Sequence, residues 1–187
     1  MPGDGMPPKS VPEAGQRLFF ALWPDASVVY ALGEAVSRVQ GGRVSRPETL
    51  HLTLAFLGEV DGDRLAELDR IAGAADSKGF TWTVAHLGYW RHNRILWAGG
   101  AAPPALLELV DHLRKGLAAA GFSLSDAGRR FVPHVTLARR TPEPPAKLPE
   151  MVPIRWDCRE FVLVRSKLSS RGAGYEIIGR WPLPNPG

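Results

Sequence analysis

The feature that most constrains this chain is a short pattern that occurs twice: a histidine, one apolar residue and a threonine, inside an apolar run. The first pair is His51 and Thr53, and the second is His134 and Thr136. Both runs are rich in residues that favour strands and are bounded by turn or loop residues, so each predicts a β-strand. One such pair is weak evidence of function, whereas two in similar strands require a common explanation.

The two pairs have the composition of an acid–base catalytic site. Because strand side chains alternate between faces, the histidine and the threonine of each pair lie on the same face. An imidazole titrates at about pH 6.5, so one ring can be neutral while the other is protonated. A threonine hydroxyl can donate to an oxygen that carries negative charge during the reaction. Two histidines and two threonines around one tetrahedral centre suit a phosphodiester, and we predict all four as catalytic residues.

Arginines flank the second pair. Arg129 and Arg130 precede the strand, and Arg139 and Arg140 end it. A guanidinium group can bind two phosphate oxygens at once, so we expect Arg130 and Arg139 to bind substrate. Strict alternation would turn Arg139 away from His134 unless the strand ends or twists before it. The alternative interpretation is two buried core histidines, and the doubled pattern with its flanking arginines argues against it.

The order of the predicted elements indicates an internal duplication. Residues 17–57 are predicted to form a strand, a helix and a His-x-Thr strand, and residues 94–139 repeat that order. Two such units related by a pseudo-twofold axis would bring the two histidines to opposite sides of a cleft. We therefore expect the catalytic residues to meet although they are far apart in the sequence.

Hydrophobic periodicity predicts the remaining elements. Apolar stripes indicate helices over residues 25–40, with Asp25 as the N-cap, over residues 63–76, and between Pro103 and Gly121. Strands are predicted over residues 17–22, 80–87, 94–98, 158–166 and 174–183. In the strand over residues 80–87, alternation places Trp82 and His86 on one face.

Length and composition indicate a single globular domain. With 187 residues the chain can bury a sizeable core. We expect a disordered tail over residues 1–16, which are rich in proline and glycine, and one domain over residues 17–187. No apolar run reaches the roughly 18 residues of a membrane helix, and the first residues lack the apolar centre of a secretory signal. We expect a cytoplasmic monomer that has no contact with membranes.

Missing motifs make several classes of function less probable. Cys158 is the only cysteine, which excludes an internal disulfide and a thiolate metal cluster, and its strand-like setting predicts a buried thiol. No His-Glu-x-x-His or Cys-x-x-Cys spacing occurs, so we predict no metal site. No glycine-rich phosphate loop occurs, so use of ATP or GTP is not indicated. The net charge of +4 neither favours nor excludes a phosphate-bearing substrate.

The motifs together resemble those of a known group of enzymes. Residues 47–58 resemble the first motif of the 2H phosphoesterase superfamily, which is named for its two His-x-Thr motifs, and residues 131–139 resemble the second. Residues 17–21 resemble the opening strand of that group, and residues 161–166, 174–175 and 181–183 resemble its C-terminal strands. The chain is most similar to the bacterial 2'-5' RNA ligase and RNA 2',3'-cyclic phosphodiesterase branch.

This resemblance implies an α+β fold with two pseudo-twofold-related lobes of antiparallel sheet, outer helices and a central cleft. It implies hydrolysis of a terminal RNA 2',3'-cyclic phosphate to a 2'-phosphate, with no metal and no cofactor. His51 would protonate the leaving 3'-oxygen and His134 would deprotonate the attacking water, while the threonines and Arg139 hold phosphate oxygens. The implied partner is RNA with a cyclic phosphate end, tRNA fragments among the candidates. Attack by an RNA 5'-hydroxyl instead of water would give ATP-independent 2'-5' ligation.

Aromatic residues are expected to stack on the bases of a single-stranded RNA end. We predict Phe19 and Phe131 as substrate contacts, with Phe20 and Tyr175 as further candidates, and each also fits a core position. Two other functions stay open: a phosphodiesterase of 2'-5' oligonucleotides or small cyclic-phosphate metabolites, and a non-catalytic RNA-binding module. Replacing either histidine by alanine separates them, because only an enzyme has turnover to lose.

Overall fold

The computed structural model of the protein describes residues 15–125, 128–142, 147–169 and 172–185. The predicted tail lies outside these ranges up to residue 14, and Gln16 already belongs to the first strand. The helices are α1 (Ala26–Ser37), α2 (Leu65–Gly73) and α3 (Pro104–Ala119), with 3-10 turns η1 (Pro47–Thr49) and η2 (Gly62–Arg64). The strands are β1 (Gln16–Leu22), β2 (Arg43–Val44), β3 (Leu52–Val60), β4 (Phe80–Val84), β5 (His86–Trp90), β6 (Ile95–Gly99), β7 (His134–Arg139), β8 (Ile154–Cys158), β9 (Glu160–Ser169) and β10 (Gly172–Pro182).

An eight-stranded antiparallel sheet is the frame of the molecule. Its order is β10-β9-β1-β3-β7-β6-β5, and β2 also pairs with β7. Strand β3, which begins one residue after His51, and strand β7, which begins at His134, are neighbours at its centre, yet only Leu52 and Val135 pair between them. The sheet therefore has two halves joined at that point, each with one His-x-Thr strand at its inner edge. This arrangement confirms the predicted two-lobed α+β fold.

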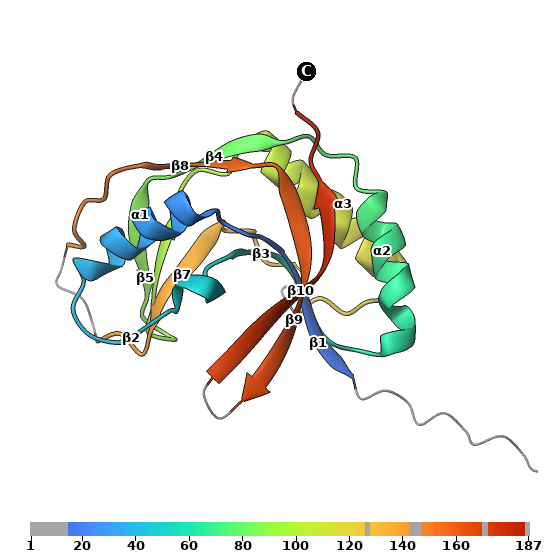
Figure 1. Cartoon of the computed structure of the whole chain (residues 1–187), viewed down its shortest axis with the longest axis horizontal. Coiled ribbons are helices and arrows are strands. Elements are labelled where there is room, and N and C mark those ends of the chain that lie inside the picture. The colour runs from blue at the N-terminus through green and yellow to red at the C-terminus, as the bar shows by residue number, and fades with distance from the viewer. Residues whose placement is uncertain (1–14, 126–127, 143–146, 170–171, 186–187) are drawn as a thin grey trace, which may run out of the picture.

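Helices α1 and α3 form where an apolar stripe follows a suitable first turn. Asp25 caps α1, because its Oδ1 accepts a hydrogen bond of 3.0 Å from the Val28 amide. Pro104 begins α3, and the predicted stripe of that helix is buried. Helix α1 follows β1 but contacts β7, and α3 follows β6 but contacts β3. Each unit thus sends its helix across to the other half, as the pseudo-twofold predicts; Figure 1 shows α1 on the left and α3 on the right.

The predicted single strand over residues 80–87 is wrong. Strand β4 pairs with β8 in a separate two-stranded sheet, whereas β5 joins the large sheet beside β6. Trp82 is fully buried against Trp156, with ring centroids 5.7 Å apart, while His86 is exposed. Alternation could not reveal the break, because each half of the run has a strand-like pattern of its own. Strand β8, the partner of β4, is absent from the predicted elements.

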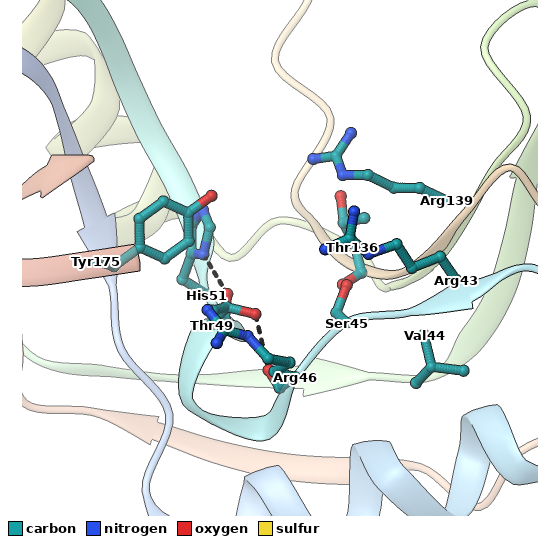
Figure 2. Close-up of a pocket in the computed structure, with 9 residues that line it drawn as sticks. All are labelled: Arg43, Val44, Ser45, Arg46, Thr49, His51, Thr136, Arg139 and Tyr175. Atoms are coloured by element: carbon teal, nitrogen blue, oxygen red, sulfur yellow. Dashed lines mark hydrogen bonds between the residues drawn. The ribbon is translucent and has the colours of Figure 1, made fainter. Parts of the chain in front are cut away.

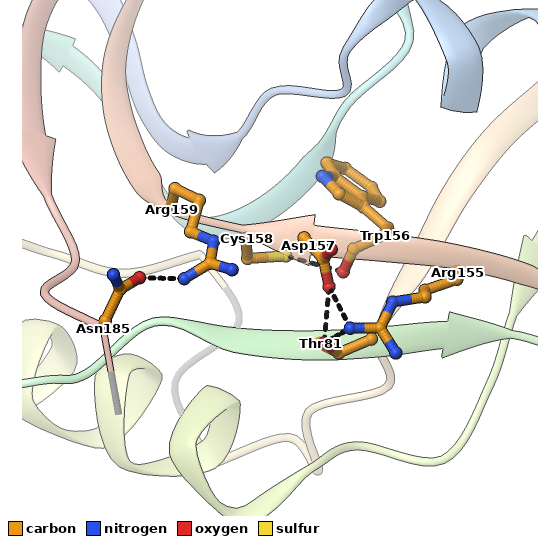
Figure 3. A network of polar contacts seen from close by, with 7 residues as sticks. All are labelled: Thr81, Arg155, Trp156, Asp157, Cys158, Arg159 and Asn185. Atoms are coloured by element: carbon orange, nitrogen blue, oxygen red, sulfur yellow. Dashed lines mark hydrogen bonds and ion pairs between the residues drawn. The ribbon is translucent and has the colours of Figure 1, made fainter. Parts of the chain in front are cut away.

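Polar side chains link β4 to β8 on their outer face (Figure 3). Thr81 Oγ1 donates to Asp157 Oδ1 at 2.5 Å, and Arg155 forms an ion pair of 3.0 Å with the same carboxylate. Cys158 points to the opposite face and is buried, and this burial raises the pKa of its thiol to about 12. The thiol is therefore protonated at neutral pH, in agreement with the predicted buried cysteine.

Candidate active site

Two adjoining cavities lie on the face of the large sheet that the helices leave uncovered. The first, of about 440 Å³, is lined by both histidines and both threonines of the motifs together with Arg139. The second shares His51, Thr136 and Arg139 with the first and also contains Arg43. Figure 2 shows His51 and Tyr175 on one side of this second cavity, and Thr136, Arg139 and Arg43 on the other. The structure thus brings the four predicted catalytic residues to one site of a size that suits a nucleotide.

The two histidines make equivalent hydrogen bonds. The Nδ1 atom of His51 lies 2.7 Å from the carbonyl oxygen of Thr49, and Nδ1 of His134 lies 2.8 Å from that of Val132. A carbonyl oxygen can only accept, so Nδ1 carries the proton in both rings. In the neutral state the lone pair is then on Nε2, the atom that can take a proton from a substrate. In both motifs the partner is the carbonyl oxygen two residues before the histidine, as expected for two units related by a pseudo-twofold axis.

Aromatic rings surround both imidazoles. Trp23 stacks on His51 with an interplanar angle of 7° and centroids 5.5 Å apart, and Phe19 lies 4.9 Å from the same ring. Trp90 lies edge-on to His134 at 4.5 Å. These rings displace water from the imidazoles, and a charged ring is poorly solvated in such surroundings.

Burial is accordingly the main cause of a shifted titration at both histidines. It lowers the pKa of His51 from its ordinary 6.5 to about 4, against the opposing effect of the hydrogen bond to Thr49 and with the help of positive charge on His134 and Arg139. Burial also lowers the pKa of His134, again opposed by its backbone hydrogen bond and assisted by Arg139. Both rings are therefore predominantly neutral at pH 7 in the free protein.

The threonines are placed by the contact between β3 and β7. Leu52 pairs with Val135 in an antiparallel sense, so the two motifs run past this junction in opposite directions. Both threonines are half-buried in the first cavity. One histidine and one threonine from each motif thus line the same cavity.

A β-bulge at Leu137 turns Arg139 toward the cavities. Two successive residues of β6 pair with Ala138 and Thr136, so Leu137 has no partner in that ladder. The extra residue shifts the alternation of β7 by one position. Arg139 therefore lines both cavities rather than pointing to the opposite face. This bulge is the irregularity that strand alternation requires if Arg139 is to face the same side as His134.

Of the other three predicted substrate contacts, Phe19 lines a cavity, whereas Phe131 and Arg130 lie outside both cavities. Phe19 lines the first cavity, but it is only 3% exposed and packs against His51, so it forms the cavity floor. Phe131 packs against the main core, with the guanidinium of Arg114 over its ring, and neither it nor the exposed Arg130 is among the described residues that line the two cavities. Tyr175, the further candidate, lines both cavities.

Sequence reasoning missed Arg43 and Trp90. Arg43 pairs with Arg139 through the short strand β2, so two guanidinium groups lie on neighbouring strands at the second cavity. Trp90 reaches the first cavity from the end of β5. The basic segment before the first motif was a signal for Arg43, whereas no local pattern distinguishes Trp90 from a core tryptophan.

Within the described ranges, no group of three or more His, Cys, Asp or Glu side chains is arranged to hold a metal ion. In the same part of the chain, none of the helices combines the length and apolar character that crossing a membrane requires.

Comparison with known proteins agrees with this site. A sequence model of the family described as "LigT like Phosphoesterase" matches residues 22–97 and 100–175, and each segment contains one His-x-Thr pair. The chain is 34% identical over 172 residues to the RNA 2',3'-cyclic phosphodiesterase of Escherichia coli (strain K12), covering 90% of this chain and 97% of that protein. It is 30% identical to the protein of the same name from Thermus thermophilus, covering 89% and 90%.

Solved structures show the same fold. The crystal structure of E. coli LigT in apo form has a TM-score of 0.83 at 32% identity, covering 92% of this chain and all of that one. The structure of E. coli LigT complexed with 3'-AMP has a TM-score of 0.79 at 31% identity, covering 91% and 99%. The two motifs, the two-lobed sheet and these relatives lead to one conclusion: the chain belongs to the LigT-like phosphoesterase family of 2H phosphoesterases.

Proposed function

We propose that the protein is an RNA 2',3'-cyclic phosphodiesterase that forms 2'-phosphate ends by two-histidine acid–base catalysis without a metal ion. The observation that carries this proposal is the meeting of both His-x-Thr pairs and Arg139 in one cavity. The names of relatives that cover most of the chain support the substrate. The equivalent Nδ1 hydrogen bonds support the chemistry, because they leave Nε2 of each ring to exchange protons.

The reaction needs two proton transfers. His134 takes a proton from water as the water oxygen attacks phosphorus, and the bond between phosphorus and the 3'-oxygen breaks. His51 gives its proton to that oxygen, which leaves a 3'-hydroxyl and a 2'-phosphate. The threonine hydroxyls and the Arg139 guanidinium hold the non-bridging oxygens. Each positioned proton transfer contributes on the order of 10²–10⁴ in rate.

Binding of the substrate has to change the protonation of the acid. Both imidazoles are predominantly neutral in the free protein, and His51 has the pKa of about 4. The proposed acid thus begins with a low pKa, and the anionic phosphate is the group that raises it, because a nearby opposite charge favours the imidazolium. The assignment of His51 as acid rests on the family resemblance, and the low pKa of His51 in the free protein would by itself favour the reverse.

The same proton transfers support ligation when an RNA 5'-hydroxyl replaces water. The phosphorus then bridges the 2'-oxygen of one RNA and the 5'-oxygen of the other, so a 2'-5' linkage forms without ATP. A cytoplasmic location, a monomeric state and tRNA fragments as the natural substrate stay predictions.

The decisive experiment is hydrolysis of a short RNA that ends in a 2',3'-cyclic phosphate, in the presence of EDTA. Wild type, His134→Ala and the control His112→Ala, an exposed position on α3, are compared. We expect wild type and the control to release a 2'-phosphate, and His134→Ala to lose at least about 10² in rate. A 3'-phosphate product would contradict the assigned leaving oxygen. RNA binding without turnover would favour the binding module, and turnover confined to other cyclic phosphates would favour the metabolite alternative.

A further inference from the structure

The two motifs differ in chemical character at one position that the pseudo-twofold makes equivalent. Both continue as Leu-Ala after the threonine, and the next residue is Arg139 in the second motif but Phe56 in the first. Strand β3 has a bulge at Leu54, like the bulge of β7, because Ala55 and Thr53 pair with successive residues of β1. Phe56 therefore faces the cavity, as Arg139 does from the other half.

A guanidinium group lies over this phenylalanine. The Cζ atom of Arg17 is 4.9 Å from the centroid of the Phe56 ring. Arg17 is exposed and lines the first cavity from β1, on the same strand face as Phe19. The Phe56 ring stacks on Phe19 at 6.5 Å, and Phe19 lies 4.9 Å from His51. A row of rings thus leads from the catalytic histidine to Arg17, which is separated from the histidine by two phenylalanines.

The other cations near this end of the cavity already share an ion-pair partner. Arg165 and Lys167 on β9 both pair with Glu176, at 3.4 Å and 2.7 Å. The hydrogen bond and charge of Lys167, with Arg165, hold the pKa of that carboxyl below its usual range. In the described part of the chain Arg17 forms no ion pair, although Glu59 is its cross-strand neighbour. Its planar group can therefore bind a phosphate while it stacks on the ring below.

We propose that Arg17, supported by Phe56, binds a backbone phosphate of the RNA upstream of the terminal cyclic phosphate. This inference rests on the proposed function and extends it to the substrate class, an oligonucleotide rather than a single nucleotide. Arg139 acts on the phosphate that reacts, and Arg17 acts on one that does not. Because Phe56 stands where the second motif has Arg139, one side of the cleft supports Arg17 and the other binds the reacting phosphate.

The experiment compares substrates of increasing length. A nucleoside 2',3'-cyclic monophosphate has no upstream phosphate, whereas di-, tri- and tetranucleotides with the same end have one, two and three. We expect Arg17→Ala to hydrolyse the mononucleotide as wild type does, and to lose about tenfold in kcat/KM, mainly through KM, once the chain includes the bound phosphate. The slope of log affinity for oligonucleotide against log salt should become shallower by about 0.7.

Two further variants make the result specific. Arg70→Ala removes an exposed arginine of α2, which lines a different cavity, and should match wild type on every substrate. Arg17→Lys keeps the charge but loses the planar group, and should be intermediate. An equal loss for Arg17→Ala on all lengths, or a loss confined to ligation, would overturn the upstream role while leaving the proposed function intact. A wild type that hydrolyses none of the substrates would overturn both.

Discussion

The burial of His51 predicts a loss of stability in acid. Its pKa is about 4 in the folded protein, below the ordinary 6.5. In the unfolded chain the ring is solvated, so it takes up a proton as the pH falls through about 6.5, whereas the folded protein takes it up only near pH 4. Above that window the ring is neutral in both states and adds no pH dependence. Within it, each step toward acid favours the unfolded chain.

The size of the effect follows from the same two pKa values. Linkage gives a loss of about 2 kcal/mol between about pH 7 and about pH 4.5, because the unfolded chain binds the proton and the folded protein does not. This is an upper value, since the ring is half-buried and solvent screens part of the cost. Compared with the roughly 5–15 kcal/mol that stabilise a typical domain, such a loss is measurable.

The assay is urea unfolding at both pH values for wild type, His51→Gln and the control His112→Gln. Carboxyl groups and His134 titrate in all three proteins, so their contributions cancel in the comparison. We expect wild type and the control to lose the same free energy of unfolding on acidification, and His51→Gln to lose about 2 kcal/mol less. The exposed His112 has no comparable burial.

Equal losses in all three proteins would refute the reasoning, because they would mean that burial does not hold His51 neutral. Proton NMR of the wild-type His51 ring gives an independent check, with an expected titration midpoint near 4. A midpoint near 6.5 would remove the basis for a neutral His51 in the free protein, and with it the need for substrate to raise the pKa of the proposed acid.

Substitutions at three other residues test the site and the fold further. Thr136→Val removes a hydroxyl donor to the phosphate and should lower kcat by about 10²–10³ in the cyclic-phosphate assay, whereas Thr136→Ser should retain most activity; equal activity of both variants would contradict the role. Tyr89→Phe removes the 2.9 Å hydrogen bond to the carbonyl oxygen of Thr141, just beyond Arg139, and should cost about 1 kcal/mol in urea unfolding; an unchanged midpoint would show that water replaces the bond. Asp25→Ala removes the α1 cap and should cost about 1 kcal/mol, while Asp25→Asn, still a good cap, should cost much less.

Much of the fold could be predicted from patterns among neighbouring residues, and the helices show why. The stripe and cap of α1 are a property of neighbouring residues, so Asp25 and the buried Val28 and Leu32 could be assigned from the sequence. The His-x-Thr strands were visible for the same reason, since alternation places both functional residues on one face. The doubled order of strand, helix and strand then suggested that the two motifs meet.

The break between β4 and β5 lay beyond such rules. Residues 80–90 are strand-like throughout, and only the competing partners β8 and β6 decide that the chain leaves one sheet and enters another. The position of Phe131 is also decided by distant residues. Its place next to the second motif suggested a substrate contact, but packing against the core and Arg114 determines where its ring lies.

The sequence by itself determined the candidate catalytic residues, their pairing on strands and the resemblance to a family, because each is recorded in residues that are close together. The tertiary structure decided which charges and rings surround them. The bulge at Leu137 that turns Arg139 to the cleft exists only in the pairing with β6, and the low pKa of His51 exists only once Trp23 and Phe19 shield its ring from part of the solvent. Strand register and burial are set by partners distant in the chain, so no local pattern can encode them.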